Sequence, residues 1–261
     1  MKRLRRLAVR SVRAQRREFL AEGPQAVREA LADSMCLEVL ATAGGTERSP
    51  DLLAAATATQ LTWTVVDDDV LAALSGTVSP QGVVALCRFV DVPLDMVLAP
   101  SPRLLAVCAD VRDPGNAGTV IRCADAAGAD AVVLTGASVD PYNPKVVRAS
   151  VGSIFHLGLA VDRDPVRVTD AVRSAGLTVL AADADAEVDL DEAIDSGLLD
   201  APTAWLFGNE SWGLPDPVRA LADRVVNVPI HGRAESLNLA TAAAVCLYAS
   251  ARAQRRSATP G

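Results

Sequence analysis

The chain has 261 residues, of which half are apolar and 22% are charged, and its formal net charge is −7. A chain of this length and composition is globular and forms one large domain or two modest ones. It contains no run of about 18 uncharged apolar residues, which excludes a membrane-spanning helix.

The N-terminal segment is strongly basic. Residues 1–17 carry eight basic side chains and no acidic one, so the excess of acid lies in the rest of the chain. Such an arm suits contact with a polyanion such as RNA, with Arg3, Arg5 and Arg6 as candidates. A solvated, disordered terminus explains the run equally well. No apolar core or cleavage site follows, so we do not expect the arm to be a secretory signal.

Residues 1–92 are expected to form a small α/β domain. The helical spacing of Ala26, Val27, Ala30 and Leu31 predicts an amphipathic helix over 19–31. Strands are predicted at 36–40, 61–66 and 83–90. A short helix is predicted at 67–74, where the opening acids suit the helix dipole. The prolines in 93–103 predict a linker.

Residues 104–256 alternate strands with helices. The predicted strands lie at 104–109, 131–134, 154–159, 177–181, 203–207 and 224–228. Helices are expected from about Gly118, from Pro165 and from about Ser236. Short apolar strands separated by helices indicate a parallel sheet that is covered on both faces. Ligands of such sheets bind at the carboxyl ends of the strands, where three polar loops follow.

The first loop comprises residues 113–118, DPGNAG, and is followed by Arg122. An ordinary turn into a helix explains the loop by itself. Gly118 and Arg122 are four residues apart and would share a helix face near the N-terminus, where the arginine fork could clamp a phosphate.

The second and third loops carry glycines and polar side chains. Residues 207–214, FGNESWGL, follow an apolar strand, and glycine permits close approach of a ligand to the backbone. Residues 228–240, VPIHGRAESLNLA, lead into the last helix, with Ser236 as the expected N-cap. The free N–H groups of a helix start also suit an adenine edge or a carboxylate. Taken alone, the first and second loops are better explained as structural turns, whereas the capping and ligand roles of the third can coexist.

Metal and disulfide sites are not indicated. The five cysteines are scattered without a CxxC pair, and the two histidines have no partner at metal-ligand spacing. This pattern favours a reducing cytoplasm. His156 lies in the predicted strand 154–159 and is interpreted as a core or edge histidine.

Together and in this order, the three loops resemble the signature motifs of the SpoU (TrmH-like) family within the SPOUT RNA methyltransferases. The match consists of Asn116, Gly118 and Arg122, then FGNE with GL at 213–214, then VPI with SLN at 236–238. Residues 143–153, NPKVVRASVGS, resemble the family's intervening segment. The resemblance covers about residues 104–252. The front domain resembles, more weakly, the family's L30e-like substrate-binding domain, at 19–23 and 82–85.

The resemblance implies a SPOUT-type α/β domain with a trefoil knot, active as a homodimer. The implied activity is transfer of a methyl group from S-adenosylmethionine to a ribose 2′-hydroxyl of structured RNA, with ribosomal RNA favoured over tRNA. The implied cofactor-binding residues are Leu206, Gly208, Asn209, Ile230, Leu237 and Leu239. The implied catalytic residues are Asn116, Arg122, Glu210, Ser236 and Asn238. The candidate RNA contacts are Lys145, Arg148, Ser150, Arg3, Arg5 and Arg6, for the first three of which a solvated or capping role is the competing interpretation.

The roles of the catalytic residues follow from their chemistry. The resemblance implies that Arg122 reaches the partner's site across the dimer interface. A guanidinium is not deprotonated in proteins, so Arg122 is expected to hold the target phosphate and stabilise the developing alkoxide, not to act as the base. Asn116, Ser236 and Asn238 would orient the hydroxyl and the methyl donor, and Glu210 would accept the proton or orient a partner.

Two other functions stay open. The first is methylation of an RNA base nitrogen by a protein of the same superfamily. The second is non-catalytic RNA binding, as in a ribosome-assembly factor. The chain has only nine aromatic residues, which are too few to favour a stacking platform for single-stranded RNA. We therefore expect the protein to recognise RNA through its shape, phosphates and 2′-hydroxyls. A nicotinamide-dependent dehydrogenase is rejected, because no G-x-G-x-x-G follows a strand.

Overall fold

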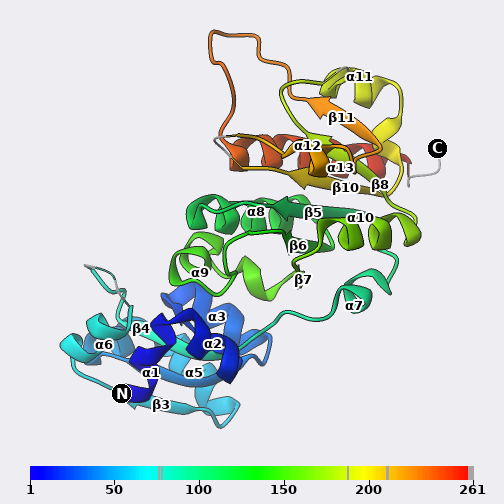
Figure 1. Cartoon of the computed structure of the whole chain (residues 1–261). Coiled ribbons are helices and arrows are strands. Elements are labelled where there is room, and N and C mark those ends of the chain that lie inside the picture. The colour runs from blue at the N-terminus through cyan, green and yellow to red at the C-terminus, as the bar shows by residue number, and fades with distance from the viewer. Residues whose placement is uncertain (76, 78, 187, 210–211, 258–261) are drawn as a thin grey trace. The chain divides into compact units, whose positions relative to one another are not determined.

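The computed structural model describes residues 1–75, 77, 79–186, 188–209 and 212–257 (Figure 1). The chain divides into two compact units. The first comprises Met1–Val90 and Asp140–His156, and the second comprises Asp91–Val139 and Leu157–Gly261. Segment 140–156, which we expect in the second domain, is therefore grouped with the N-terminal half. Its Tyr142 ring stacks on Phe89 with centroids 3.6 Å apart, and its hydroxyl accepts a hydrogen bond of 2.8 Å from the Val90 N–H.

The first unit contains a four-stranded sheet. In spatial order its strands are β1 (Glu18–Glu22), β4 (Val83–Arg88), β2 (Cys36–Ala41) and β3 (Thr62–Val65). The pair β2–β3 is parallel and the other pairs are antiparallel. The helices of this unit after the sheet's first strand are α3 (Pro24–Ala32), α4 (Ala43–Arg48), α5 (Pro50–Ala58), α6 (Asp68–Ser75) and α9 (Pro144–Ser150).

The helix predicted over 19–31 is wrong in its first part. Residues 18–22 form the edge strand β1, in which Phe19 and Ala21 alternate toward the core. Gly23, with a left-handed φ of 95°, and Pro24 at the helix start then separate the strand from α3. The inward alternation has a period of two, which is the strand signal. The helical spacing holds only beyond Gly23.

The basic arm is ordered. It forms α1 (Lys2–Arg5), a 3₁₀ turn at Arg6–Ala8 and α2 (Arg10–Arg16). Leu4 and Leu7 pack into the core of the first unit beside Leu40 and Leu71. Burial of these leucines holds the arm on the domain, since each removes apolar surface from water.

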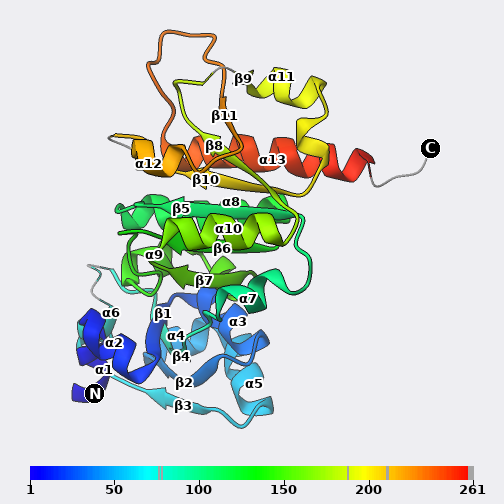
Figure 2. The same ribbon diagram turned by 45° about the vertical axis from the view of Figure 1, so that its right-hand side comes forward.

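The second unit is built on a seven-stranded sheet in which every pair is parallel, and this confirms the predicted fold class (Figure 2). In spatial order the strands are β7 (Gly158–Asp162), β6 (Ala131–Thr135), β5 (Leu104–Ala109), β10 (Thr203–Phe207), β8 (Thr178–Ala182), β11 (Arg224–Asn227) and β9 (Val188–Asp189). The strand predicted at 154–159 is displaced. Residues Ser153–Phe155 form a 3₁₀ turn, since Val151 and Gly152 turn the chain in left-handed conformations before β7.

Helices cover both faces of this sheet. They are α7 (Leu94–Leu98), α8 (Pro114–Ala127), α10 (Pro165–Ser174), α11 (Leu190–Asp195), α12 (Asp216–Arg219) and α13 (Leu239–Ser257). Leu206 of β10 belongs to the core that includes residues of α7 and α10. Its neighbour Trp205 points to the other face, where its indole N–H donates a hydrogen bond of 2.8 Å to Ser250 of α13. In the residues that the structure describes, no helix is long and apolar enough to cross a membrane.

Candidate active site

The candidate site is built from loops after β5, β10 and β11. The first loop leads into α8, where the Asp113 carboxylate accepts a hydrogen bond of 2.8 Å from the Asn116 N–H and caps the helix. The helix begins at Pro114, earlier than the predicted start at Gly118. Proline at the first helical position explains the early start, because its fixed φ suits a helix. Arg122 consequently lies in the middle of α8 and not near its N-terminus.

The structure brings Asn116 and Asn238 together. The Asn238 side-chain amide donates a hydrogen bond of 3.1 Å to the side-chain oxygen of Asn116. The Asn238 oxygen in turn accepts a hydrogen bond of 2.9 Å from the Ala240 N–H at the start of α13. Asn238 therefore caps this helix, and the prediction that Ser236 caps it is wrong. Ser236 is exposed in the loop before the helix.

The two ends of the loop after β10 are joined by hydrogen bonds. Asn209 and Gly213 exchange two backbone hydrogen bonds of 2.9 Å. A Cβ on Gly208 would lie 2.5 Å from the Gly213 carbonyl, so only glycine fits this position. The Asn209 side-chain amide donates a hydrogen bond of 3.3 Å to the Asp110 carbonyl, which ties this turn to the loop after β5. Glu210, the candidate proton acceptor, lies outside the described residues.

The loop before α13 exposes both apolar side chains and backbone N–H groups. Ile230 and Leu237 are each 37% exposed. Among the described residues, none accepts a hydrogen bond from the backbone N–H groups from Ile230 to Leu237. Apolar contact and unused N–H donors match a flat heterocycle with acceptor nitrogens, so the loop fits the adenine of S-adenosylmethionine. Leu206 is fully buried in β10, and Leu239 is nearly buried at the start of α13.

Arg122 is separated from the asparagine pair within one chain. It is exposed on α8, and no described residue pairs with it through a hydrogen bond or an ion pair. Arg122 follows Asn116 by six positions in the helix. This separation corresponds to about 9 Å along the helix axis and a rotation of roughly 120° about that axis. Burial raises the pKa of the neighbouring Cys123 thiol above its ordinary value, and the charge of Arg122 opposes that shift.

The candidate RNA contacts on α9 differ in their surroundings. Lys145 is exposed, and its backbone N–H donates a hydrogen bond to the side-chain oxygen of Asn143, which caps the helix. Arg148 donates hydrogen bonds of 3.3 Å to the Glu22 carboxylate and to the Ser75 carbonyl. Ser150 is fully buried, and its hydroxyl donates to the Val147 carbonyl. We therefore drop Ser150 from the RNA contacts, because RNA has no access to it.

The arginines of the N-terminal arm divide into structural and exposed groups. Arg13 is 3% exposed, and its guanidinium lies 2.5 Å from the Asp140 carboxylate while donating to the Leu7 and Ala8 carbonyls. Arg3 pairs with Glu18 at 3.4 Å. Arg5 and Arg6 are exposed. Part of the basic run therefore stabilises the fold through ion pairs and hydrogen bonds. Of the three arginines of the arm that we predict to contact RNA, Arg5 and Arg6 have no such side-chain interaction within the described structure.

Sequence reasoning missed three residues at the site. Asp110, with a left-handed φ of 56°, accepts the hydrogen bond from Asn209 and, through its carboxylate, one of 2.6 Å from the Ala137 N–H. Arg112 and Trp212 form a contact across the two loops. The sequence placed Asp110 and Arg112 just before the first loop and Trp212 within the second, but spacing does not reveal contacts between loops.

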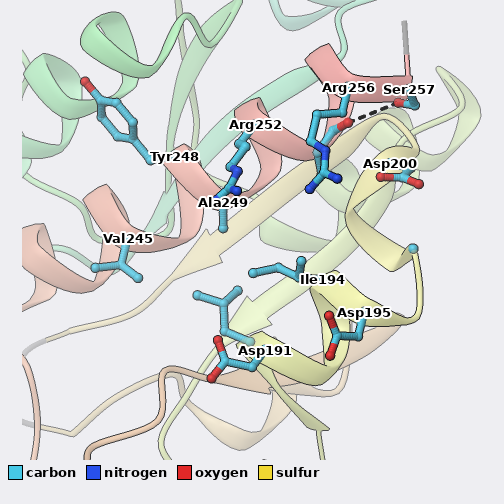
Figure 3. Close-up of a pocket in the computed structure, with 13 residues that line it drawn as sticks. Asp191, Ile194, Asp195, Asp200, Val245, Tyr248, Ala249, Arg252, Arg256 and Ser257 are labelled. Carbon is cyan, nitrogen blue, oxygen red and sulfur yellow. Dashed lines mark hydrogen bonds between the residues drawn. The ribbon is translucent and has the colours of Figure 1, made fainter. Parts of the chain in front are cut away.

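A separate cavity of about 1070 Å³ lies between α11 and α13. Figure 3 shows Ile194 and Asp195 of α11 opposite Ala249 and Arg252 of α13. None of the residues predicted to bind the cofactor or RNA lines this cavity. Within the described residues, no group of three His, Cys, Asp or Glu side chains is arranged to hold a metal ion.

Comparison with known proteins matches both halves of the chain to families. Residues 103–248 match the SpoU rRNA Methylase family, and residues 1–85 match the MRM3-like substrate binding domain. The chain is 35% identical to the uncharacterized tRNA/rRNA methyltransferase slr1673 of Synechocystis, over 100% of this chain and 93% of the relative. It is 32% identical to the 23S rRNA (guanosine(2553)-2′-O)-methyltransferase RlmP of Bacillus subtilis, over 94% of this chain and 92% of the relative.

A solved structure also matches nearly the whole chain. The SpoU methyltransferase AviRb from Streptomyces viridochromogenes, in complex with AdoMet, superposes with a TM-score of 0.84 at 30% identity. The match covers 98% of each chain.

Proposed function

The chain belongs to the SpoU rRNA Methylase family, and from this premise we propose that it transfers a methyl group from S-adenosylmethionine to a ribose 2′-hydroxyl of ribosomal RNA. The observation that carries the proposal is the hydrogen bond between Asn116 and Asn238, which joins the first and third motifs in the structure. RlmP, matched over 94% of the chain, is named for 2′-O-methylation of 23S rRNA, and AviRb, matched over 98%, binds AdoMet. These names support ribose as the acceptor over a base nitrogen.

The chain's own residues would hold the two reactants in line. Bound S-adenosylmethionine supplies an activated methyl group on a sulfonium. The loop 230–237 offers apolar contact and unused N–H groups to the adenosine. Gly208 would act indirectly, because its missing Cβ lets the Gly213 backbone approach and so shapes the neighbouring loop after β10. Asn116 and Asn238 would orient the acceptor hydroxyl beside it, with Ser236 in the same exposed loop.

We assign the phosphate of the acceptor nucleotide to Arg122. Its guanidinium is exposed and keeps its charge, so it would clamp the phosphate and stabilise negative charge on the attacking oxygen. Glu210 stays the candidate for the proton acceptor. Among the predicted RNA contacts, Lys145, Arg5 and Arg6 are exposed and suited to phosphates of the wider substrate.

We further propose that the active form is a homodimer in the cytoplasm. The position of Arg122, away from the asparagine pair of its own chain, supports its delivery to the site of a partner subunit. Val245 and Tyr248, which are 38% and 51% exposed on α13, supply apolar surface for such an interface. The trefoil knot and the domain boundaries at 92 and 104 stay predictions.

Transfer of labelled methyl from S-adenosylmethionine to separated ribosomal RNA and tRNA tests the proposal. The RNA is isolated from a strain that lacks the protein, so that the target is unmodified. We expect label in ribosomal RNA. Label in tRNA alone would overturn the substrate class. Binding of RNA without cofactor binding or transfer would instead support the non-catalytic function.

A further inference from the structure

Arg112 and Trp212 form a cation–π pair beside the candidate site. The guanidinium carbon of Arg112 lies 5.1 Å from the centroid of the Trp212 ring. Arg112 lies in the loop after β5 and Trp212 in the turn after β10, both in the second unit. The proposed mechanism uses neither side chain.

Both loops are held in place by hydrogen bonds. Trp212 lies inside the turn that Asn209 and Gly213 close, and the Asn209 side chain ties this turn to Asp110, two residues before Arg112. Arg112 follows Val111, which is fully buried and whose carbonyl accepts a hydrogen bond of 2.9 Å from Val139. These bonds hold backbone positions next to Arg112 and Trp212, which reduces the free energy that a ligand loses when it orders the pair.

The indole of Trp212 is open to a ligand. It is 52% exposed, whereas Trp205 is fully buried, and the Trp63 indole N–H is satisfied by Thr46 at 3.1 Å. In the described part of the chain, no residue accepts a hydrogen bond from the Trp212 indole N–H. A large aromatic surface exposed beside polar catalytic candidates, with a guanidinium against it, is suited to a flat, anionic ligand.

We propose that Arg112 and Trp212 form a stacking platform for one unpaired nucleobase of the substrate RNA. The proposal rests on the proposed function, which brings RNA to this edge of the sheet. The base stacks on the layer formed by indole and guanidinium, and the Arg112 charge attracts the adjoining phosphate. A single exposed indole serves one base and not an extended strand, in keeping with the few aromatic residues of the chain.

Steady-state methyl transfer to unmodified ribosomal RNA transcribed in vitro tests the platform, with Trp212→Leu, Trp212→Phe and Arg112→Ala compared with the wild type. Stacking of one base supports roughly 5- to 100-fold in affinity, so Trp212→Leu raises the KM for RNA by that factor. Trp212→Phe, the matched control, retains a ring and stays within about threefold of the wild type. The KM for S-adenosylmethionine is unchanged in all three variants. Thermal unfolding identifies any variant that fails to fold.

Tryptophan fluorescence provides a readout that does not depend on catalysis. RNA quenches the wild-type emission, and Trp212→Phe loses most of this quenching while still binding RNA. An unchanged KM for RNA in Trp212→Leu overturns the platform, as does a raised KM for S-adenosylmethionine alone, which would place the indole against the cofactor. A wild type that transfers no methyl refutes the proposed function, and the quenching with the same RNA then still decides on the platform.

Discussion

The side-chain amide of Asn238 lies 3.1 Å from the side-chain oxygen of Asn116 and donates a hydrogen bond to it. The two residues are 122 positions apart in the chain. Their contact joins the loop before α13 to the first turn of α8, and thus places the third motif against the first.

Replacing either asparagine with alanine is expected to lower turnover. Loss of an orienting amide at the acceptor hydroxyl is expected to reduce kcat about 10- to 100-fold. Asn238→Ala also removes the cap on α13 and should lower the free energy of unfolding by about 1 kcal/mol. In Asn116→Ala the Asp113 cap of α8 remains, so its stability should change less. Kinetics and urea unfolding measure both effects, and full turnover in Asn116→Ala would refute its assigned role.

Mixed dimers test whether Arg122 acts across subunits. Arg122→Ala and Asn238→Ala are each expected to retain at most about a tenth of the wild-type activity as pure proteins. When they are coexpressed, a heterodimer has one site with both an intact Asn238 and the partner's intact Arg122. Activity should therefore return to about a quarter of the wild-type value in a statistical mixture. No recovery, with heterodimers shown by mass spectrometry, would place Arg122 in the site of its own chain.

The planar guanidinium of Arg122, and not its charge alone, is expected to be needed for activity. Arg122→Lys keeps the charge but loses the planar fork, so we expect at least a tenfold loss in kcat/KM, about 1.4 kcal/mol. Initial rates at saturating S-adenosylmethionine measure this. Near-full activity of the lysine variant would contradict a bidentate phosphate clamp.

Gly208→Ala is expected to abolish cofactor binding. The new Cβ would lie 2.5 Å from the Gly213 carbonyl, so the turn after β10 must open. Gly176→Ala is the matched control, because its φ of +88° strains the backbone but nothing lies within 4 Å of the added carbon. We expect both variants to lose stability, by about 1 kcal/mol for Gly176→Ala. Calorimetry should show S-adenosylmethionine binding only for the control; binding by both would remove Gly208 from the cofactor site.

The buried pair of Arg13 and Asp140 should stabilise the first unit. Arg13→Met leaves the Asp140 carboxylate, 12% exposed, without its partner, which is expected to cost about 3–5 kcal/mol. Arg6→Met, at an exposed position, should change the free energy of unfolding by less than about 0.5 kcal/mol. Urea unfolding compares the two variants. Equal stability of the two variants would mean that the Arg13–Asp140 pair does not contribute to holding the basic arm on the first unit.

The strands of the second domain could be predicted because they are apolar runs bounded by polar loops. The runs at 104–109 and 203–207 match β5 and β10 residue for residue. At 18–22 and 154–159 the local pattern predicted the wrong element, a helix in place of a strand and a strand in place of a 3₁₀ turn. The strand β1 depends on pairing with distant β4, and the apolar Ile154 and Phe155 are buried in a 3₁₀ turn without strand geometry.

The candidate site could be predicted only in part. Family resemblance selected Asn116 and Asn238, but neither spacing nor composition could reveal a contact between residues so far apart. For the same reason, the sequence could not predict the Asn209–Asp110 hydrogen bond or the Arg112–Trp212 pair. Both form only because the parallel sheet places the ends of β5 and β10 side by side. Ser150 was chosen by its motif, whereas its burial depends on the packing of α9 within the first unit.

Nucleoside mass spectrometry of ribosomal RNA after reaction with the purified protein distinguishes a methylated ribose from a methylated base. We expect one 2′-O-methylated nucleoside that forms with the wild type and falls sharply with Asn116→Ala and Asn238→Ala. A nucleoside methylated on its base, formed in place of the 2′-O-methylated one, would contradict the proposed function.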